Sequence, residues 1–185
     1  MGGPAEPRVD SRRSHTDNRR VTLLEPDGRG ADALRNAETL PVLLHTATRA
    51  FVDAVDGIAC AISRRVGDVL IQVAEHARDG RTLVLGHGYL IADFPLTQEV
   101  LDHNTPLTCS LLDDDCDPAE AELLREVRLD SLLMLPLSLP EGRWGLAEIY
   151  VNGRVFSAED VAAAQPLAQA FGEALEQMPA PASRP

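Results

Sequence analysis

The sequence contains no lysine, so arginine supplies all of its basic side chains, and acidic residues clearly outnumber them. Seventeen arginines stand against 29 aspartates and glutamates, which gives a net charge of −12 at pH 7. Phosphate backbones and anionic lipid surfaces repel a chain with this charge. The composition therefore argues against nucleic acid and membranes as partners.

Long apolar runs are also missing. No stretch approaches the ~20 apolar residues that span a bilayer, and the amino terminus lacks the apolar core of a signal peptide. The three cysteines form no closely paired motif, which is typical of a reducing compartment rather than of a disulfide framework. The sequence thus predicts a cytoplasmic globular protein, with 44% hydrophobic residues to build a core.

The two ends of the chain differ in composition from the middle. Residues 1–20 are polar and carry five arginines against three acids, and the last eight residues contain three prolines. Such segments bury too little apolar surface to offset their ordering entropy. We therefore predict disordered tails at residues 1–30 and 178–185, with one domain at residues 31–177 between them.

Hydrophobic periodicity divides the middle of the chain into alternating helices and hairpins. A helical pattern over residues 32–56 is broken at Pro41, and Asp117 with Glu120 and Ser157 with Asp160 are typical helix starts. The expected strands are 58–64, 69–77, 81–85, 107–111, 131–139 and 143–151, and the expected later helices are 95–102, 118–127 and 157–177. Arg64 and Arg65 are placed at the bend of the first hairpin. This order predicts an α+β fold around an antiparallel sheet of five to six strands.

The second half of the chain contains three informative segments in order: NTPLTCSLLDDD (104–115), LDSLLMLPLSLPEGRWGLAEIYVNG (129–153) and FSAEDVAAAQPLAQAFGEAL (156–175). Together they resemble the GAF domain, a small-molecule-sensing module of many regulators. The resemblance implies that the first and last long helices cover one face of the sheet. It also implies that short helices roof a ligand pocket on the other face.

The resemblance also suggests how the chain assembles, because many such domains dimerise through their first and last helices. The first long helix has a second apolar face, which gives this idea independent support. The expected homodimer interface comprises Leu40, Leu43, Ala50, Phe171 and Leu175.

The chain departs from the best-known chemistries of this family. Cyclic-nucleotide-binding members carry a lysine–aspartate pair, but here the lysine position is Gly153, although Arg154 could approach Asp160. In free methionine sulfoxide reductases a glycine-rich loop carries a catalytic cysteine, and this chain has Leu90 there. We therefore expect no catalysis, while Cys109 and Cys116 leave open a thiol redox enzyme as an alternative.

No cofactor is indicated by the sequence. Phytochrome-type members attach a bilin to a cysteine beside a histidine, and no such pair occurs here, while a lone histidine is weak support for haem. Haem and bilin are both disfavoured. The acids at 113–117 lack the glycine-spaced alternation of a calcium loop, so no metal site is predicted.

The leading hypothesis is a non-catalytic sensory or regulatory domain that binds a small molecule and signals through dimerisation or a partner protein. A ligand-free scaffold for dimerisation or protein contact is the alternative. The candidate ligand-binding residues are those expected at the roofed pocket and its mouth: Tyr89, Phe94, Thr108, Cys109, Asp113, Asp114 and Trp144.

Overall fold

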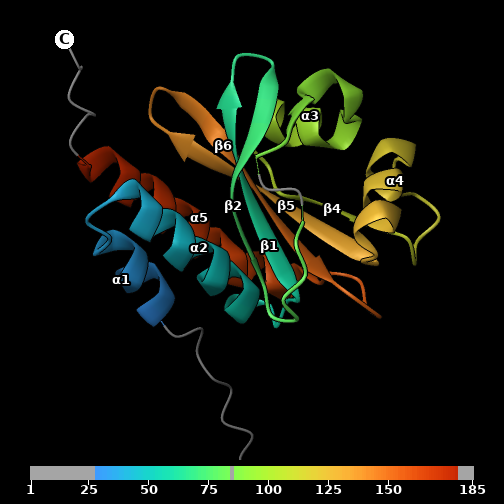
Figure 1. The fold of residues 1–185 in the computed structure, drawn as a ribbon, viewed down its shortest axis with the longest axis horizontal. Coiled ribbons are helices and arrows are strands. Elements are labelled where there is room, and N and C mark those ends of the chain that lie inside the picture. The colour runs from blue at the N-terminus through green and yellow to red at the C-terminus, as the bar shows by residue number, and fades with distance from the viewer. Residues whose placement is uncertain (1–27, 84–85, 179–185) are drawn as a thin grey trace, which may run out of the picture.

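The computed structural model describes residues 28–83 and 86–178, and these form a six-stranded antiparallel sheet with helices on both faces (Figure 1). The strand order is β3-β2-β1-β6-β5-β4. The strands are β1 (Ala59–Val66), β2 (Val69–Ala77), β3 (Gly88–Leu90), β4 (Leu107–Ser110), β5 (Ser131–Leu139) and β6 (Gly142–Val151). The predicted α+β class, with an antiparallel sheet, is confirmed.

Helices α1 (Arg29–Arg35), α2 (Leu40–Ala54) and α5 (Ala158–Gln177) cover one face, called the helix face below. The short helix η1 (Ile91–Asp93), α3 (Pro95–His103) and α4 (Pro118–Val127) cover the opposite face, called the roof face (Figure 1). This two-sided arrangement is the one that the resemblance to the GAF domain implied. Among the described residues, no helix is both long and apolar enough to cross a bilayer.

Local signals in the sequence explain most element boundaries. Ser157 and Asp160 form a complete capping box at the start of α5, and the Asp117 side chain accepts a hydrogen bond from the Ala119 amide at the start of α4. Pro136 is tolerated within β5 because β4 pairs only as far as Met134, which leaves β5 unpaired on that side.

Some predicted boundaries are wrong. Arg64 and Arg65 belong to β1, and the turn that follows lies at Gly67, whose positive φ of 61° suits glycine. Residues 81–83 form no strand, and residues 84–85 lie outside the described residues. Most of the two predicted tails also lies outside them, although Arg29 and Gly30 already belong to α1.

The helix face encloses the larger apolar cluster. This cluster lies between α2 and α5 on one side and strands β1, β5 and β6 on the other. Its fully buried members include Phe51, Leu135, Ile149 and Phe171. Gly172 allows α5 to approach β5, because a Cβ at that position would lie 2.5 Å from the Ser138 carbonyl oxygen. Close packing of this kind is what stabilises the fold and holds the sheet rigid beneath the roof face.

Candidate functional site

A second apolar cluster fills the space between the sheet and the helices of the roof face. Its fully buried members include Leu70, Leu101, Leu124, Leu132 and Met134. The cluster differs from the helix face in one respect: polar and acidic side chains are buried beside it. The buried polar residues of the roof face are Ser63, Gln72, Thr97, Glu120 and Glu148.

Glu148 places a carboxyl group inside the roof face. It lies on β6 between Leu146 and Tyr150, both members of the roof-face cluster, and its side chain is 3% exposed. Its strand neighbours are Met134 and Ala61, which are apolar. The hydroxyl of Tyr89 donates a long hydrogen bond of 3.5 Å to Glu148 Oε1.

Burial changes the acid–base behaviour of this carboxyl. The pKa of Glu148 is raised from an ordinary 4.5 to about 7, mainly by loss of hydration and in smaller part by the nearby Glu120. The hydroxyls of Tyr89, Ser63 and Tyr150 favour the ionised form and oppose that increase. Glu148 therefore changes charge near neutral pH, within a largely apolar environment.

Glu120 brings a second carboxyl to the roof face from α4. Its Oε1 atom accepts a hydrogen bond of 3.0 Å from the amide of Thr97, in the first turn of α3. It thus satisfies one of the free amides of another helix instead of completing a capping box with Asp117. Burial raises the pKa of Glu120 as well. Its second oxygen, Oε2, is buried without a hydrogen-bond partner.

The Ser63 hydroxyl acts on the Glu148 carboxyl, but among the described residues its buried oxygen makes no hydrogen bond of ordinary geometry. Ser63 follows Ala59 and Ala61 along the roof face of β1 and pairs with Leu146 across the sheet. Native proteins leave few buried polar atoms unpaired, because each costs free energy. Two such atoms on one face of the sheet therefore indicate a site that can receive a polar group.

Three predicted ligand-binding residues do lie on this face. The Tyr89 and Phe94 rings meet edge to face with centroids 4.8 Å apart, and both side chains are half-buried. Cys109 belongs to the roof-face cluster and is 4% exposed. No ligand is bound to any of them, so their role stays a prediction.

Two others lie on the opposite face. Trp144 sits at a bulge between β5 and β6, where the register shifts, and its ring packs against Phe171 of α5 at 5.2 Å. A bulge reverses the alternation of side chains, which the sequence pattern did not reveal. Thr108 is paired with Leu133, a helix-face residue, and is exposed. Placing Trp144 and Thr108 at the roofed pocket is therefore wrong.

Asp113 and Asp114 are exposed, and their role in ligand binding stays a prediction. Cys109 is joined by a disulfide to Cys116, with Cα atoms 5.0 Å apart, so the loop between them is closed at its base. The sequence favoured reduced cysteines and left Cys109 and Cys116 open as a redox pair; the structure joins these two, and the buried Cys60 is free.

The expected dimer interface is mostly internal. Leu43 and Phe171 are fully buried in the helix-face cluster and cannot reach a second chain, so this part of the prediction is wrong. α1 packs over Ala50, where a Cβ added at Gly30 would lie 3.7 Å from the Ala50 side chain. The second apolar face of α2 is thus covered by a helix of the same chain. Leu40 and Leu175 are partly buried.

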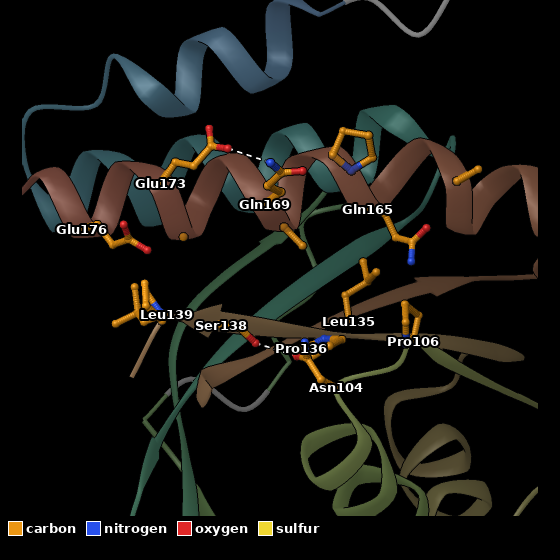
Figure 2. Close-up of a pocket in the computed structure, with 15 residues that line it drawn as sticks. Asn104, Pro106, Leu135, Pro136, Ser138, Leu139, Gln165, Gln169, Glu173 and Glu176 are labelled. Carbon is orange, nitrogen blue, oxygen red and sulfur yellow. Dashed lines mark hydrogen bonds between the residues drawn. The ribbon is translucent and has the colours of Figure 1, made fainter. Parts of the chain in front are cut away.

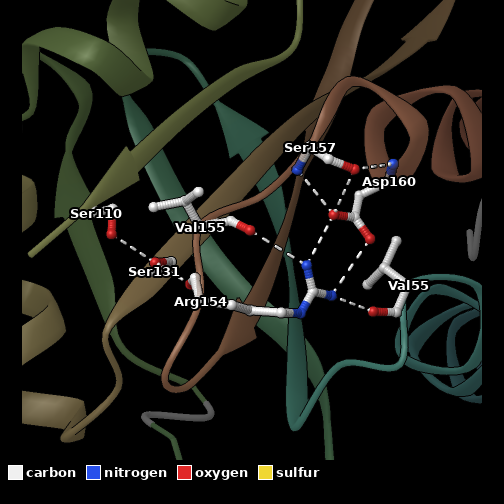
Figure 3. Close-up of polar contacts among 7 residues, drawn as sticks. All are labelled: Val55, Ser110, Ser131, Arg154, Val155, Ser157 and Asp160. Atoms are coloured by element: carbon white, nitrogen blue, oxygen red, sulfur yellow. Dashed lines mark hydrogen bonds and ion pairs between the residues drawn. The ribbon is translucent and has the colours of Figure 1, made fainter. Parts of the chain in front are cut away.

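The predicted approach of Arg154 to Asp160 is confirmed (Figure 3). The guanidinium donates two hydrogen bonds to the Asp160 carboxylate, at 2.7 and 3.2 Å, and a third to the carbonyl oxygen of Val55. Arg154 thereby ties the end of α2 to the start of α5. This pair joins a loop after β6 to the start of α5 and takes no part in the roof-face cluster.

An open groove of about 670 Å³ lies between α5 and β5 (Figure 2). Leu135, Pro136 and Leu139 of β5 form one wall, and Gln165, Gln169 and neighbouring residues of α5 form the other. Polar groups at this groove bond to one another: Gln169 donates to Glu173, and Ser138 donates to Asn104. These polar groups therefore need no hydrogen-bond partner from outside the chain. On the roof face, by contrast, the side-chain oxygen of Ser63 and one carboxyl oxygen of Glu120 have no such partner among the described residues.

Sequence reasoning missed the residues that distinguish the roof face. Glu148 is the one acid within the apolar stretch 144–151, and it shares alternation with Leu146 and Tyr150. That pattern could have identified a buried carboxyl. Glu120 gave no such signal, because an acid in the first turn of a helix is expected for capping alone.

The fold is shared with the chromophore-binding domains of phytochromes. The chromophore-binding domain of Stigmatella aurantiaca phytochrome P1 is 16% identical with a TM-score of 0.71, and the match covers 92% of this chain and 63% of that one. The chromophore-binding domain of an unusual bacteriophytochrome from R. palustris is 13% identical with a TM-score of 0.70, covering 80% and 58%. This chain thus spans less than two thirds of either relative.

A smaller solved structure matches over nearly its whole length. This is a far-red-absorbing protein with bound biliverdin IXa, 16% identical with a TM-score of 0.64, and the match covers 82% of this chain and 99% of that one. At such identities the likeness establishes the fold alone. Comparison with curated proteins finds no match. Family assignment rests instead on residues 13–175, which match the family described as "GAF domain". Since this match spans most of the sequence and the fold agrees with it, the chain belongs to the GAF domain family.

Proposed function

We propose that this protein is a non-catalytic regulatory domain that binds a small molecule between the sheet and the roof helices α3 and α4. Membership of a family of small-molecule-sensing domains supports a binding role. The observation that carries the proposal is the pair of buried, unpartnered oxygens of Ser63 and Glu120 on the roof face. A ligand with polar groups would satisfy them and so stabilise the folded state.

The test is native mass spectrometry of the protein purified without denaturation, together with its melting temperature against a panel of metabolites. We expect a retained mass that unfolding releases, or a metabolite that raises the melting temperature. Two variants locate the site by replacing a buried polar side chain with an apolar one. Glu148→Leu on the roof face should abolish binding, whereas Thr48→Val, at a buried polar residue of α2, should not.

The alternative is a scaffold that keeps the fold for dimerisation or protein contact without a ligand. The leucines and methionine packed in the roof face favour it. A protein that carries no added mass and that no metabolite stabilises would support the scaffold and contradict the proposal. Binding that persists in Glu148→Leu would contradict the proposed location.

Signalling through a homodimer or a partner chain belongs to the same proposal. Because α1 covers part of the expected interface, the apolar side chains that remain available include the partly buried Leu40 and Leu175 and the exposed Val42. Light scattering at tens of micromolar should report a dimer. A monomer at that concentration would contradict this part.

A thiol enzyme is a second candidate because Cys109 and Cys116 are joined. If the protein is such an enzyme, it reduces free methionine sulfoxide with a thiol reductant, and the Cys109→Ser, Cys116→Ser double variant loses this activity. We expect no turnover in the parent protein. Covalent bilin attachment is not proposed, because Cys109 and Cys116 are bonded to each other and Cys60 is buried.

A further inference from the structure

We infer that the ligand of the roof face carries a cationic nitrogen, such as a primary ammonium group, on a short apolar body. This inference rests on the proposed function, because it names the chemistry of the ligand at the same site. Its basis is the arrangement of two carboxyl groups, an unpartnered hydroxyl and apolar walls that the roof face encloses.

Two side-chain contacts and one strand pairing link the two carboxyl groups across the roof face. Glu120 accepts the amide hydrogen of Thr97, and the Thr97 hydroxyl lies 3.6 Å from the sulfur of Met134. Met134 pairs with Glu148 across β5 and β6. The site therefore runs from α4 across the start of α3 to the centre of the sheet, with Tyr89 at its far side.

Among the described residues, we find no ion pair that reaches either carboxyl group of this site. Within the described part of the chain, the arginines form their ion pairs with Asp32, Asp53, Asp56, Asp79, Glu122, Asp160 and Glu173. None of those pairs includes Glu120 or Glu148. The groups that act on Glu148 are the hydroxyls of Tyr89, Ser63 and Tyr150 and the carboxyl of Glu120. A bound cation would supply the missing positive charge and hydrogen-bond donors.

The same surroundings discriminate among ligands. An anion would meet two acids in an apolar environment, where repulsion is weakly screened. A metal ion fits poorly, because the described residues hold no group of three His, Cys, Asp or Glu side chains placed to bind one. An ammonium group donates hydrogen bonds to carboxylate and hydroxyl oxygens, which are the buried groups that Glu120, Glu148 and Ser63 offer on this face. Its apolar body would then contact Leu and Met side chains of the roof-face cluster.

The experiment compares three probes of one length: hexylammonium, hexan-1-ol and hexanoate, titrated calorimetrically into the full chain at pH 8. We expect hexylammonium to bind about tenfold or more tightly than either of the others, the factor of a charge-assisted hydrogen bond. Its affinity should also fall at pH 6, as Glu148 becomes protonated. Tyr89, Tyr150, Glu120 and Ser63 are the groups that face Glu148 during that titration.

Three single substitutions assign the charge. Glu148→Gln and Glu120→Gln preserve shape and should each weaken hexylammonium binding about tenfold. Glu126→Gln, at an exposed acid of the same helix α4, should leave it unchanged. Circular dichroism establishes that each variant is folded. If Glu148→Gln does not fold, the role of the carboxylates is tested by hexylammonium binding to Glu120→Gln and by the pH dependence of binding to the parent protein.

The outcomes separate this inference from the proposed function. Equal or tighter binding of hexan-1-ol or hexanoate would overturn the cationic ligand and leave a small-molecule site in place. Hexylammonium binding that is absent, or that both Gln variants retain, would also overturn it. The proposed function is tested separately by native mass spectrometry, in which a retained mass that unfolding releases supports a small-molecule site whatever the charge of the ligand.

Discussion

On the helix face of the sheet, α1, α2 and α5 bury an apolar cluster that includes Phe51, Leu135 and Phe171. On the roof face, α3 and α4 bury a smaller apolar cluster together with Glu120 and Glu148. A carboxyl group inside a protein costs free energy unless it is fully hydrogen-bonded or paired. The helix face therefore stabilises the domain. The buried carboxyl groups of the roof face lower the free energy of unfolding, but they place polar groups where a ligand could bind.

The largest effect should come from a truncation on the helix face. Phe171→Ala removes a fully buried ring that contacts Trp144, and it should lower the free energy of unfolding by about 3–5 kcal/mol. Urea denaturation at pH 7 measures this. A loss below about 1 kcal/mol would break the comparison, because the helix face would then not be tightly packed.

Stability should depend on pH through Glu148 in a direction opposite to that of ordinary acids. Its folded pKa of about 7 exceeds the unfolded value of 4.5, so the folded state holds the proton more tightly. Stability conferred by the protonated form is present below pH 4.5 and is lost as the pH rises to 7, amounting to about 3 kcal/mol.

Comparison with Glu148→Gln isolates this contribution, because acids with lowered pKa values, such as Asp160 and Glu173, act in the opposite direction in both proteins. The difference in unfolding free energy between parent and variant should change across pH 4.5–7. A difference that stays constant with pH would show that Glu148 is not desolvated.

The disulfide should stabilise the roof side by constraining the unfolded chain. Cys109 and Cys116 are seven residues apart, and closing a loop of that length contributes roughly 2–3 kcal/mol. The double variant Cys109→Ser, Cys116→Ser should lose this amount in non-reducing buffer. A thiol reductant should destabilise the parent by a similar amount and leave the variant unaffected; equal responses would contradict the assignment.

A smaller effect is expected at the ion pair that joins α2 to α5. Arg154→Ala leaves Asp160 without its two guanidinium hydrogen bonds and should cost about 1–2 kcal/mol. Arg35→Ala, which removes a more exposed pair with Glu173, should cost at most about 1 kcal/mol. Thermal unfolding of both variants measures the two losses of stability. Equal losses would mean that the greater burial of the Arg154–Asp160 pair adds nothing to its contribution.

Periodic patterns and capping residues made most of the fold predictable. The break at Pro41 and the start of α5 at Ser157 both follow from local rules, and these place the elements in order. The candidate site was less predictable. A bulge moved Trp144 to the helix face, and Glu120 contacts a helix 23 residues away in the sequence. Such contacts depend on how the elements pack together, which local patterns do not encode.

The contrast between the two faces is tested most directly by a carbon-13 NMR titration of the glutamate side-chain carboxyls. Glu148 would be assigned by the signal that is absent from Glu148→Gln. The account predicts a midpoint for Glu148 near pH 7, because the roof face removes its hydration. A midpoint near the ordinary value of 4.5 would contradict it, since the carboxyl would then be hydrated and the roof face would hold no buried acidic centre.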